Sequence, residues 1–287
     1  MISIVQLGTI DYATGLRLQQ QLIALRKEEK IGDVLLLLEH KPVITLGRNA
    51  KAANVVASAD LLAQRGVELF ECDRGGDVTF HGPGQIVGYP IFDLRSHSEP
   101  GGKRKTLGVI EFVRRLEEVL IRTCADFAIP AKRVPGLTGV WTYPPTLSSR
   151  AEENDSKNHS LESRDLLFAG ATTNYVATAA SAVSRSEVSG PGQNDEAKLA
   201  AIGVHISRFV TSHGFALNVN TDLTYFNLIV PCGITTKPVT SMQQELGKPL
   251  DMSTVAESIS RNFGTVFSSQ MLWVETLDAL LRRALPV

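Results

Sequence analysis

The chain has 287 residues, 43% of them hydrophobic, and its 29 basic and 30 acidic residues leave a formal net charge of −1. This hydrophobic content is ample for the core of a single domain, whereas the balanced charge argues against the general electrostatic attraction that nucleic acid binding requires. Cys72, Cys124 and Cys232 lie far apart without Cys-x-x-Cys spacing, and the six histidines are scattered, so neither a disulfide framework nor a metal site is indicated.

The N-terminal residues 1–7 read as a strand and carry neither a basic nor an arginine-rich leader. No apolar run reaches the roughly 18 residues that a membrane span needs. These features predict a soluble, cytoplasmic protein in a reducing compartment.

Taken in order, the first half of the chain alternates strand and helix patterns. We expect a helix at 12–30 with Asp11 as its N-cap, and the apolar run 33–40 indicates a strand covered on both faces. The other elements expected before residue 135 are a strand ending at Gly47 and Arg48, a short helix at 57–65, strands at 67–72 and 86–94, and a long helix from Thr106, its N-cap, to Phe127.

The second half of the chain has a strand within 135–142 and resumes strand character at 198–207. Between them, residues 143–197 contain nine serines mixed with Asn, Asp, Glu and Gly, a composition unable to offset its ordering entropy. We therefore expect one domain, 1–287, interrupted by a flexible insertion whose ends lie close together across a hairpin. The elements expected beyond it are a strand at 215–219, entered through His213 and Gly214, a helical turn at 222–227, and helices at 240–246, 253–267 and 276–284.

Strand patterns outnumber helix patterns along the chain, and most of the links between them are short enough for hairpins. Such a chain favours an α+β fold, in which helices pack against a mixed β-sheet. Cys72 and Cys124 continue the apolar patterns of their strand and helix, so packing is the simplest interpretation of both.

One stretch, residues 74–85, is a poor core segment because it holds four glycines and a proline among polar side chains. It reads as a loop that cradles a substrate, since glycines let backbone N–H groups approach a ligand and Arg74, Thr79 and His81 offer donors. The alternative is a tight connection between the strands at 67–72 and 86–94.

The sequence of this stretch, R-G-G-D-V-T-F-H-G-P-G-Q, resembles the signature of the lipoyl(octanoyl) transferases, which move an octanoyl group from acyl carrier protein to a lysine of a lipoyl domain. Residues 39–48 are similar to the E-H-x-P-V-x-T-L-G-R segment near the family's acyl pocket, although Arg48 read alone is a surface charge and His40 a strand-end histidine. Phe80 departs from the family, which more often has Tyr there. The resemblance implies the fold of biotin and lipoate protein ligase catalytic domains, with no metal and no cofactor.

Cys232 lies outside any regular apolar pattern, between a proline and a glycine that leave room around its sulfur. It reads either as an acylated nucleophile or as a buried thiol in a turn. A nucleophilic thiol needs a nearby cation or base, because free cysteine, with a pKa of about 8.5, is mostly protonated at neutral pH. Lys198, at the start of an apolar strand, is the candidate for this cation or base. The alternative is that it is a solvated strand end. Both residues match the catalytic Lys/Cys pair of the family.

The resemblance implies two displacements. Cys232 attacks the thioester of octanoyl-acyl carrier protein, and a lysine of a lipoyl domain then takes the octanoyl group as an amide, without ATP. Lys198 stabilises the thiolate and relays protons, while backbone N–H groups near the glycines bind the oxyanion. The implied acceptors are lipoyl domains of 2-oxoacid dehydrogenase complexes and the glycine cleavage H protein. The substrate-binding residues that carry over are Arg74, Gly75, Gly76, Asp77, Val78, Thr79, Phe80, His81, Ala201, Ile202, Gly203, Gly214, Phe215 and Ala216.

Two other classes of protein remain open at this point. An ATP-dependent lipoate or biotin ligase shares the fold and uses a lysine to bind an acyl-adenylate. A non-catalytic binder of acylated carrier domains needs an apolar groove and no nucleophile.

Overall fold

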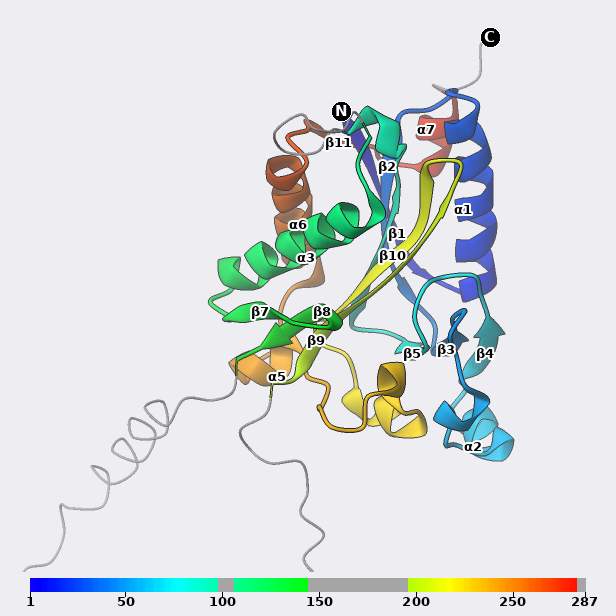
Figure 1. Ribbon diagram of the computed structural model, residues 1–287, viewed down its shortest axis with the longest axis vertical. Coiled ribbons are helices and arrows are strands. Elements are labelled where there is room, and N and C mark those ends of the chain that lie inside the picture. Colours follow the sequence, from blue (N-terminus) through cyan, green and yellow to red (C-terminus); the bar gives the residue numbers. More distant parts are fainter. Residues whose placement is uncertain (98–105, 144–195, 283–287) are drawn as a thin grey trace, which may run out of the picture. The chain divides into compact units, whose positions relative to one another are not determined.

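The computed structural model describes residues 1–97, 106–143 and 196–282. The strands of its larger sheet are β1 (Ile2–Ile10), β2 (Asp33–His40), β6 (Gln85–Ile91), β7 (Ala131–Val134), β8 (Leu137–Thr142), β9 (Lys198–Ser207), β10 (Val210–Asn218) and β11 (Met271–Trp273). They pair in the order β11-β1-β2-β6-β10-β9-β8-β7 (Figure 1). The pairs β11–β1 and β1–β2 are parallel and the others antiparallel, so the predicted mixed sheet is confirmed.

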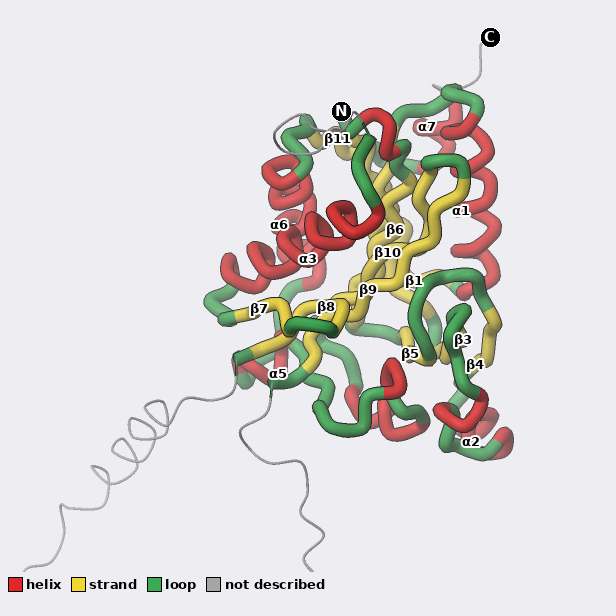
Figure 2. Tube along the Cα trace, viewed as in Figure 1, coloured by secondary structure: helices red, strands yellow, loops and turns green. Residues whose placement is uncertain are grey.

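Helices cover both faces of this sheet (Figure 2). The long helices are α1 (Tyr12–Lys27), α3 (Val109–Asp126) and α6 (Met252–Val266), and the short ones α2 (Ala59–Gln64), α5 (Met242–Leu246) and α7 (Leu277–Arg282). Side chains alternate along a strand, and in β2 Leu35 and Leu37 pack in the cluster of α3 and α6, whereas Leu36 and Leu38 pack in the cluster of α1 and α7. The prediction that this strand is buried on both faces is confirmed.

A second, three-stranded sheet holds part of the glycine-rich stretch. Its strands β3 (Val43–Leu46), β4 (Glu68–Glu71) and β5 (Val78–His81) pair in the order β4-β3-β5. The interpretation of residues 74–85 as one continuous loop or connection is therefore wrong, because residues 78–81 form a strand antiparallel to β3. The reason is their alternation: Val78 and Phe80 bury one face of β5 in a separate hydrophobic cluster, and Thr79 and His81 point the other way.

The predicted helix boundaries need two corrections. Asp11 caps α1 as expected, accepting from the backbone N–H of Thr14 at 2.7 Å, but the helix ends three residues early, at Lys27. Thr106 does not cap α3, which begins at Val109 after Gly108. The backbone N–H of Leu107 donates to the carbonyl of Leu94 at 3.0 Å, and this bond holds the chain before the helix against the 3₁₀ turn Leu94–Ser96.

Besides β5, two strands are absent from the predictions, and another strand is longer than predicted. β7 contains Ala-Lys-Arg-Val and β11 only three residues, too few for a period of two to show. His213 and Gly214 do not lead into β10 but lie within it, since the strand begins at Val210. The helical turn at 222–227 is the 3₁₀ turn Leu223–Leu228.

The two ends of the insertion meet where β8 pairs with β9. Trp141 lies opposite Lys198, the backbone N–H of Thr142 donates to the carbonyl of Ala197 at 2.9 Å, and that of Ala197 returns to the Thr142 hydroxyl at 3.2 Å. The prediction that the ends lie close together is confirmed. The flexible character of the insertion and the single-domain organisation stay predictions, because residues 144–195 lie outside the described residues.

Among the helices within the described ranges, none is both long enough and apolar enough to cross a bilayer.

We predict that residues 144–194 can be replaced by a short Gly/Ser linker without loss of cooperative unfolding or of activity. The hydrogen bonds between Thr142 and Ala197 close the hairpin at its base, so the linker only has to span a short gap. Urea unfolding of the shortened chain checks the fold, and acyl transfer checks the site. Loss of the cooperative transition would show that the insertion packs into the core.

Candidate active site

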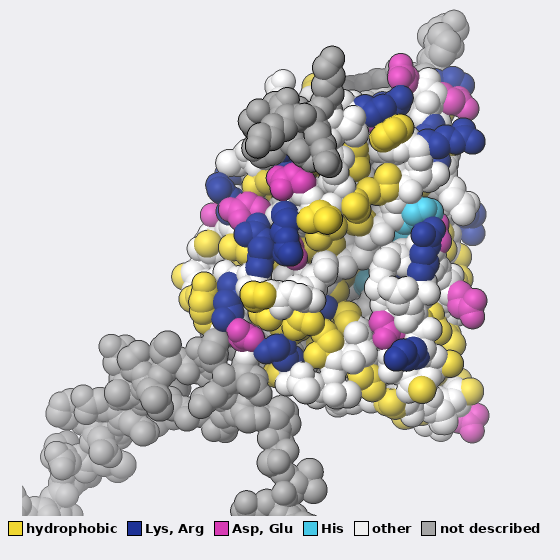
Figure 3. Space-filling view, in the orientation of Figure 1, with side chains coloured by type: hydrophobic (Ala, Val, Ile, Leu, Met, Phe, Trp, Pro, Cys, Tyr) yellow, Lys and Arg dark blue, Asp and Glu magenta, His cyan; other side chains and the backbone are white. Residues whose placement is uncertain are grey.

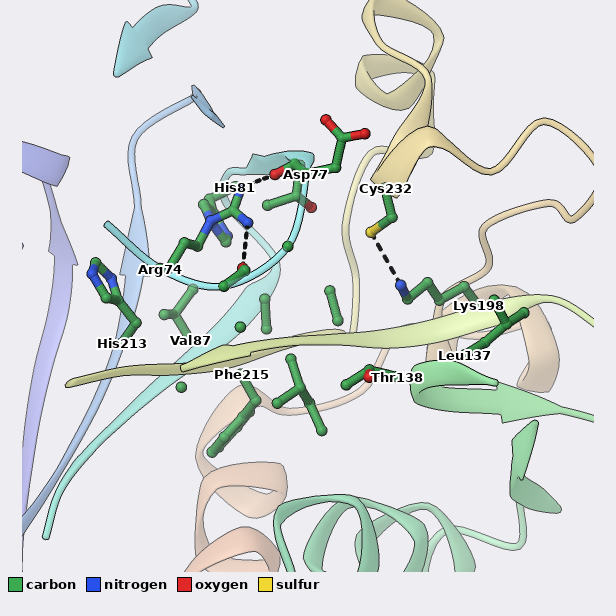
Figure 4. Close-up of a pocket in the computed structure, with 18 of the residues that line it drawn as sticks. Arg74, Asp77, His81, Val87, Leu137, Thr138, Lys198, His213, Phe215 and Cys232 are labelled. Carbon is green, nitrogen blue, oxygen red and sulfur yellow. Dashed lines mark hydrogen bonds between the residues drawn. The ribbon is translucent and has the colours of Figure 1, made fainter. Parts of the chain in front are cut away.

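A cavity of about 230 Å³ lies over β9, β10 and β6 and beneath the loop that precedes β5. Figure 3 shows the surface hollowed between the β9–β10 hairpin and this loop. Of the residues predicted for the site, all line the cavity except Val78 and Phe80. Figure 4 shows Cys232 and Lys198 at one end of it and His81, Val87 and His213 toward the other.

The two exceptions lie on the opposite face of β5. Val78 and Phe80 are 0% and 1% exposed, and the Phe80 ring stacks on Tyr225 with 4.7 Å between ring centroids and packs edge-on against Phe226. Because this ring points into the small hydrophobic cluster, its substitution for the family's Tyr does not change the lining of the cavity. Both residues support the site through packing.

Cys232 occupies the centre of the 3₁₀ turn Pro231–Gly233, with φ 55° and ψ 20°. A side chain other than glycine in this left-handed region costs on the order of 1–3 kcal/mol and persists only where its surroundings impose it. Here a Cβ on Gly233 would lie 2.7 Å from a carboxylate oxygen of Asp77, so only glycine fits. The thiol is half-buried and lines the cavity, which excludes the interpretation as a buried packing thiol.

The turn around Cys232 is held by the loop before β5. The Asp77 carboxylate accepts from the Asn54 side-chain amide at 2.6 Å and from the backbone N–H of Val78 at 2.8 Å. The carbonyl of Asn54 in turn accepts from the backbone N–H of Val230 at 2.7 Å. Asn54 therefore joins the glycine-rich loop to the turn that presents the thiol.

Lys198 points its ammonium at the thiol, with Nζ 3.1 Å from Sγ of Cys232 (Figure 4). It is only 8% exposed and its Nζ lies 5.2 Å from the centroid of the Trp141 ring, so the interpretation as a solvated strand end is wrong. Its backbone is fixed too: its N–H donates to the carbonyl of Pro238 at 2.8 Å and its carbonyl accepts from Thr240 at 3.0 Å. These bonds attach the start of β9 to the segment that follows the Cys232 turn.

Arg74 was predicted to donate hydrogen bonds to the ligand, but in the structure its guanidinium donates to the protein itself. Its guanidinium donates to the backbone carbonyls of Thr45, Asp77 and Gly75 at 2.6, 2.7 and 3.1 Å. It also donates to the Thr45 hydroxyl. The residue lines the cavity, but these bonds commit its charge to holding the loop in shape. Arg48 lies outside the cavity and is exposed, with Nη2 3.1 Å from Nε2 of His205, so its interpretation as a surface charge is confirmed.

His81 and His40 are buried and neutral. Burial lowers the pKa of His40 to about 4, and burial lowers that of His81 to about 3, because a charged His81 would also be repelled by the Arg74 guanidinium and by a protonated His40. Nδ1–H of His81 donates to Gln85 Oε1 at 2.7 Å, and Nδ1–H of His40 donates to the carbonyl of Ile10 at 3.2 Å. Nε2 of each ring is therefore the acceptor; that of His40 receives the Tyr89 hydroxyl at 2.6 Å.

Several lining residues were missed by the sequence predictions, namely Tyr12, Val87, Tyr89, Gly136, Leu137, Thr138, His213 and Ile234. Tyr12 opens α1, and Val87 and Tyr89 belong to the inner strand β6, where the pattern indicates only core packing. His213 could have been found from its position beside Gly214: it has φ 55° within β10, and its Nε2–H donates to Asp73 at 2.7 Å.

Of the two remaining cysteines, Cys124 packs as predicted, whereas Cys72 lies just after β4, is part-buried and takes no part in the hydrophobic clusters of the described residues. Cys124 is fully buried on α3, and burial raises the pKa of its thiol to about 12. Cys72 donates to the carbonyl of Leu46 at 3.4 Å. Across the described parts of the chain, no three His, Cys, Asp or Glu side chains are grouped to hold a metal ion.

Comparison with known families gives one matching family model, described as the lipoyl protein ligase A/B catalytic domain, over residues 11–264. The chain is similar to an octanoyltransferase of Koribacter versatilis, with 55% identity over 98% of this chain and 90% of that protein. It is also similar to an octanoyltransferase of Acidobacterium capsulatum, with 48% identity over 98% and 96% of the two chains.

Solved structures share the fold at low sequence identity. The bipartite lipoate protein ligase of Thermoplasma acidophilum matches with a TM-score of 0.61 and 13% identity, over 99% of this chain and 91% of that one. A lipoate-protein ligase A bound with ATP matches with a TM-score of 0.59 and 14% identity, over 99% and 93%. The predicted likeness to lipoate ligase catalytic domains is thereby confirmed for the fold.

We predict that Lys198→Ala slows the alkylation of Cys232 at neutral pH and slows acyl transfer, because the thiolate loses the cation 3.1 Å away. Lys198→Arg keeps the positive charge but does not release a proton near neutral pH, so it retains part of the alkylation rate and fails in aminolysis. Iodoacetamide kinetics and single-turnover aminolysis separate the two roles. Unchanged rates in Lys198→Ala would require a different base.

We predict that the free energy of unfolding falls as the pH drops from about 6.5 toward 4. His40 and His81 have pKa values of about 4 and 3 in the folded chain, so between these values and 6.5 the unfolded chain binds more protons. Each buried histidine contributes up to about 1.4 kcal/mol per pH unit in its window. Urea unfolding at pH 7 and pH 5 measures the loss, and His40→Gln should make the dependence shallower. An equal dependence in both chains would contradict the assignment to His40.

Proposed function

The chain belongs to the lipoyl protein ligase A/B catalytic domain family, and from this membership we propose that a thioester on Cys232 carries the acyl group during transfer. Its octanoyltransferase relatives, 55% and 48% identical over 98% of the chain, make it an acyltransferase that acts in octanoyl transfer for protein lipoylation. Its substrates are, in general terms, an acyl carrier and a lipoyl domain. The observation that carries the proposal is the 3.1 Å contact between Lys198 Nζ and Cys232 Sγ at the end of a groove floored by small apolar residues.

The first displacement loads the enzyme. The Cys232 thiolate attacks the carbonyl carbon of the octanoyl thioester, a carbon–sulfur bond forms, and the bond to the carrier's thiol sulfur breaks. The Lys198 ammonium gives a proton to the departing thiolate and becomes a neutral amine. One thioester replaces another of similar energy, so this step needs no ATP.

The oxyanion of the tetrahedral intermediate needs preorganised donors. The loop before β5 supplies backbone N–H groups next to Cys232, and that of Gly75 is already used by the carbonyl of Val204 at 3.1 Å. The N–H groups of Gly76 and Asp77, which line the same cavity, take this role. Arg74 holds the loop in place through the carbonyls of Gly75 and Asp77.

The second displacement unloads the enzyme onto the acceptor. The amine of a lipoyl-domain lysine attacks the thioester carbonyl, an amide bond forms, and the bond to Cys232 Sγ breaks. Lys198, left neutral by the first step, takes the proton of the attacking amine and again faces a thiolate. The acceptors that fit this chemistry are the lipoyl domains of 2-oxoacid dehydrogenase complexes and the glycine cleavage H protein.

We predict that incubation with octanoyl-acyl carrier protein adds one octanoyl group to the intact protein and that hydroxylamine removes it, as it removes a thioester. Cys232→Ala should abolish the adduct, because the other thiols lie outside the cavity and Cys124 is buried. Intact-protein mass spectrometry measures both, with Cys72→Ala as the matched control that keeps the adduct.

Three other outcomes point elsewhere. An adduct that persists in Cys232→Ala contradicts the assignment of Cys232 as the nucleophile. Activation of free octanoate that needs ATP and survives Cys232→Ala indicates a ligase. A stoichiometric complex with the acylated carrier and no turnover indicates a binding protein.

A further inference from the structure

The floor of the cavity is a row of small side chains that crosses three neighbouring strands. In the register of the sheet, Ala201 on β9 lies opposite Ala216 on β10, and Ala216 lies opposite Val87 on β6. All three line the cavity. Beside this row Gly203 lies opposite Gly214, which carries no side chain into the groove. Neighbouring strands lie about 4.8 Å apart, so the row from Ala201 on β9 to Val87 on β6 is about 10 Å long. Its first strand, β9, is the one that carries Lys198.

The row of small residues ends at a wall of aromatic rings. Tyr12 from α1, His81 from β5 and Tyr89 from β6 all line the cavity and surround the buried ring of His40. The rings of Tyr12 and His81 stack with centroids 6.3 Å apart, and His40 lies 5.1, 5.9 and 5.9 Å from Tyr12, His81 and Tyr89. Aromatic rings packed this closely leave no room for an extended ligand to continue past them.

Tyr89, His40 and His81 of this wall have hydrogen-bond partners within the protein. The Tyr89 hydroxyl donates to His40, which donates to the carbonyl of Ile10. His81 donates to Gln85, whose amide donates to Asn218 Oδ1 at 2.8 Å. The rings that face the cavity are therefore uncharged and pinned in place, which suits the methyl end of an alkyl chain better than a polar or charged end group.

We propose that this aromatic wall, in which Tyr89 stands two residues after Val87 on β6, sets the upper limit on the acyl-chain length that the site accepts. The inference rests on the proposed function, because it places the acyl carbonyl at Cys232 and the chain along Ala201, Ala216 and Val87. An eight-carbon chain ends at the wall, and longer chains meet the Tyr89 ring. The residue is a specificity determinant and takes no part in the chemical steps.

The test compares acylation of the enzyme by octanoyl-, decanoyl- and dodecanoyl-acyl carrier protein. Tyr89→Leu removes the phenol ring and opens space toward His40, so kcat/KM for dodecanoyl relative to octanoyl transfer should rise about tenfold or more. Tyr89→Phe keeps the ring and loses only the hydroxyl, so it should keep the wild-type ratio. A loss of stability common to both variants cannot produce this difference.

Three further variants keep the test informative if Tyr89→Leu folds poorly. Val87→Ala makes a smaller opening at the same end and should raise the decanoyl-to-octanoyl ratio. Ala216→Val places a larger side chain in the middle of the groove, which shortens the space for the acyl chain, and should favour hexanoyl over octanoyl transfer. Tyr225→Leu makes the same exchange of Tyr for Leu in the separate cluster beside Phe80, outside the cavity, and should leave the ratio unchanged.

Binding of free fatty acids to Cys232→Ala, measured by calorimetry, tests the wall without any acyl transfer. The variant that also carries Tyr89→Leu should gain affinity for dodecanoate relative to octanoate. If this gain appears while the wild-type chain forms no thioester, the result supports the aromatic wall as the limit on chain length and contradicts the proposed function. If thioester forms on Cys232 but neither Tyr89→Leu nor Val87→Ala moves the chain-length ratios, the wall is not the determinant.

Discussion

The contact between Lys198 and Cys232 depends on a backbone arrangement more than on the two side chains themselves. Lys198 begins β9, and its N–H and carbonyl bond to Pro238 and Thr240. These bonds fix the distance between the strand and the segment carrying the thiol before any side chain is placed. The lysine then has no freedom to reach solvent, since it is 8% exposed and lies against Trp141. A buried ammonium without a hydrogen-bond partner is costly, and the Cys232 sulfur 3.1 Å away is the partner that Lys198 meets there.

The other basic groups around the cavity either have partners elsewhere or are uncharged. The Arg74 guanidinium is directed to backbone carbonyls, and His40 and His81 are held neutral by burial. The cavity thus combines a close contact between an ammonium and a thiol at one end with a floor of small apolar residues. This division suits a substrate that has a single electrophilic carbon at one end and only hydrocarbon at the other.

The sequence predicts that Lys198 and Cys232 belong together but not the shape of the groove. Cys232 and Lys198 were found because their types and settings match a known pair, although 34 positions of sequence separate them. Tyr12 and Tyr89 carry no such signal, because a tyrosine in a buried strand or at a helix start reads the same whether it lines a cavity or fills a core. The glycines around β5 obscure its strand pattern in the sequence. The sequence also does not show which acceptor the Arg74 guanidinium reaches, and in the structure that acceptor is a backbone carbonyl and not a ligand.

The position of β9 and β10 in the sheet has a consequence for synthesis on the ribosome. β6 pairs with β2 on one side and with β10 on the other, whereas β7 and β8 reach the sheet only through β9. Until residue 218 has emerged, the nascent chain holds two unconnected pieces of sheet, and β6, buried at every residue in the finished fold, has an unpaired apolar edge. Such an edge is prone to pair with another chain. The apolar edge of β6 is covered only when β10 pairs with it, and both Cys232 and the edge strand β11 emerge after that step.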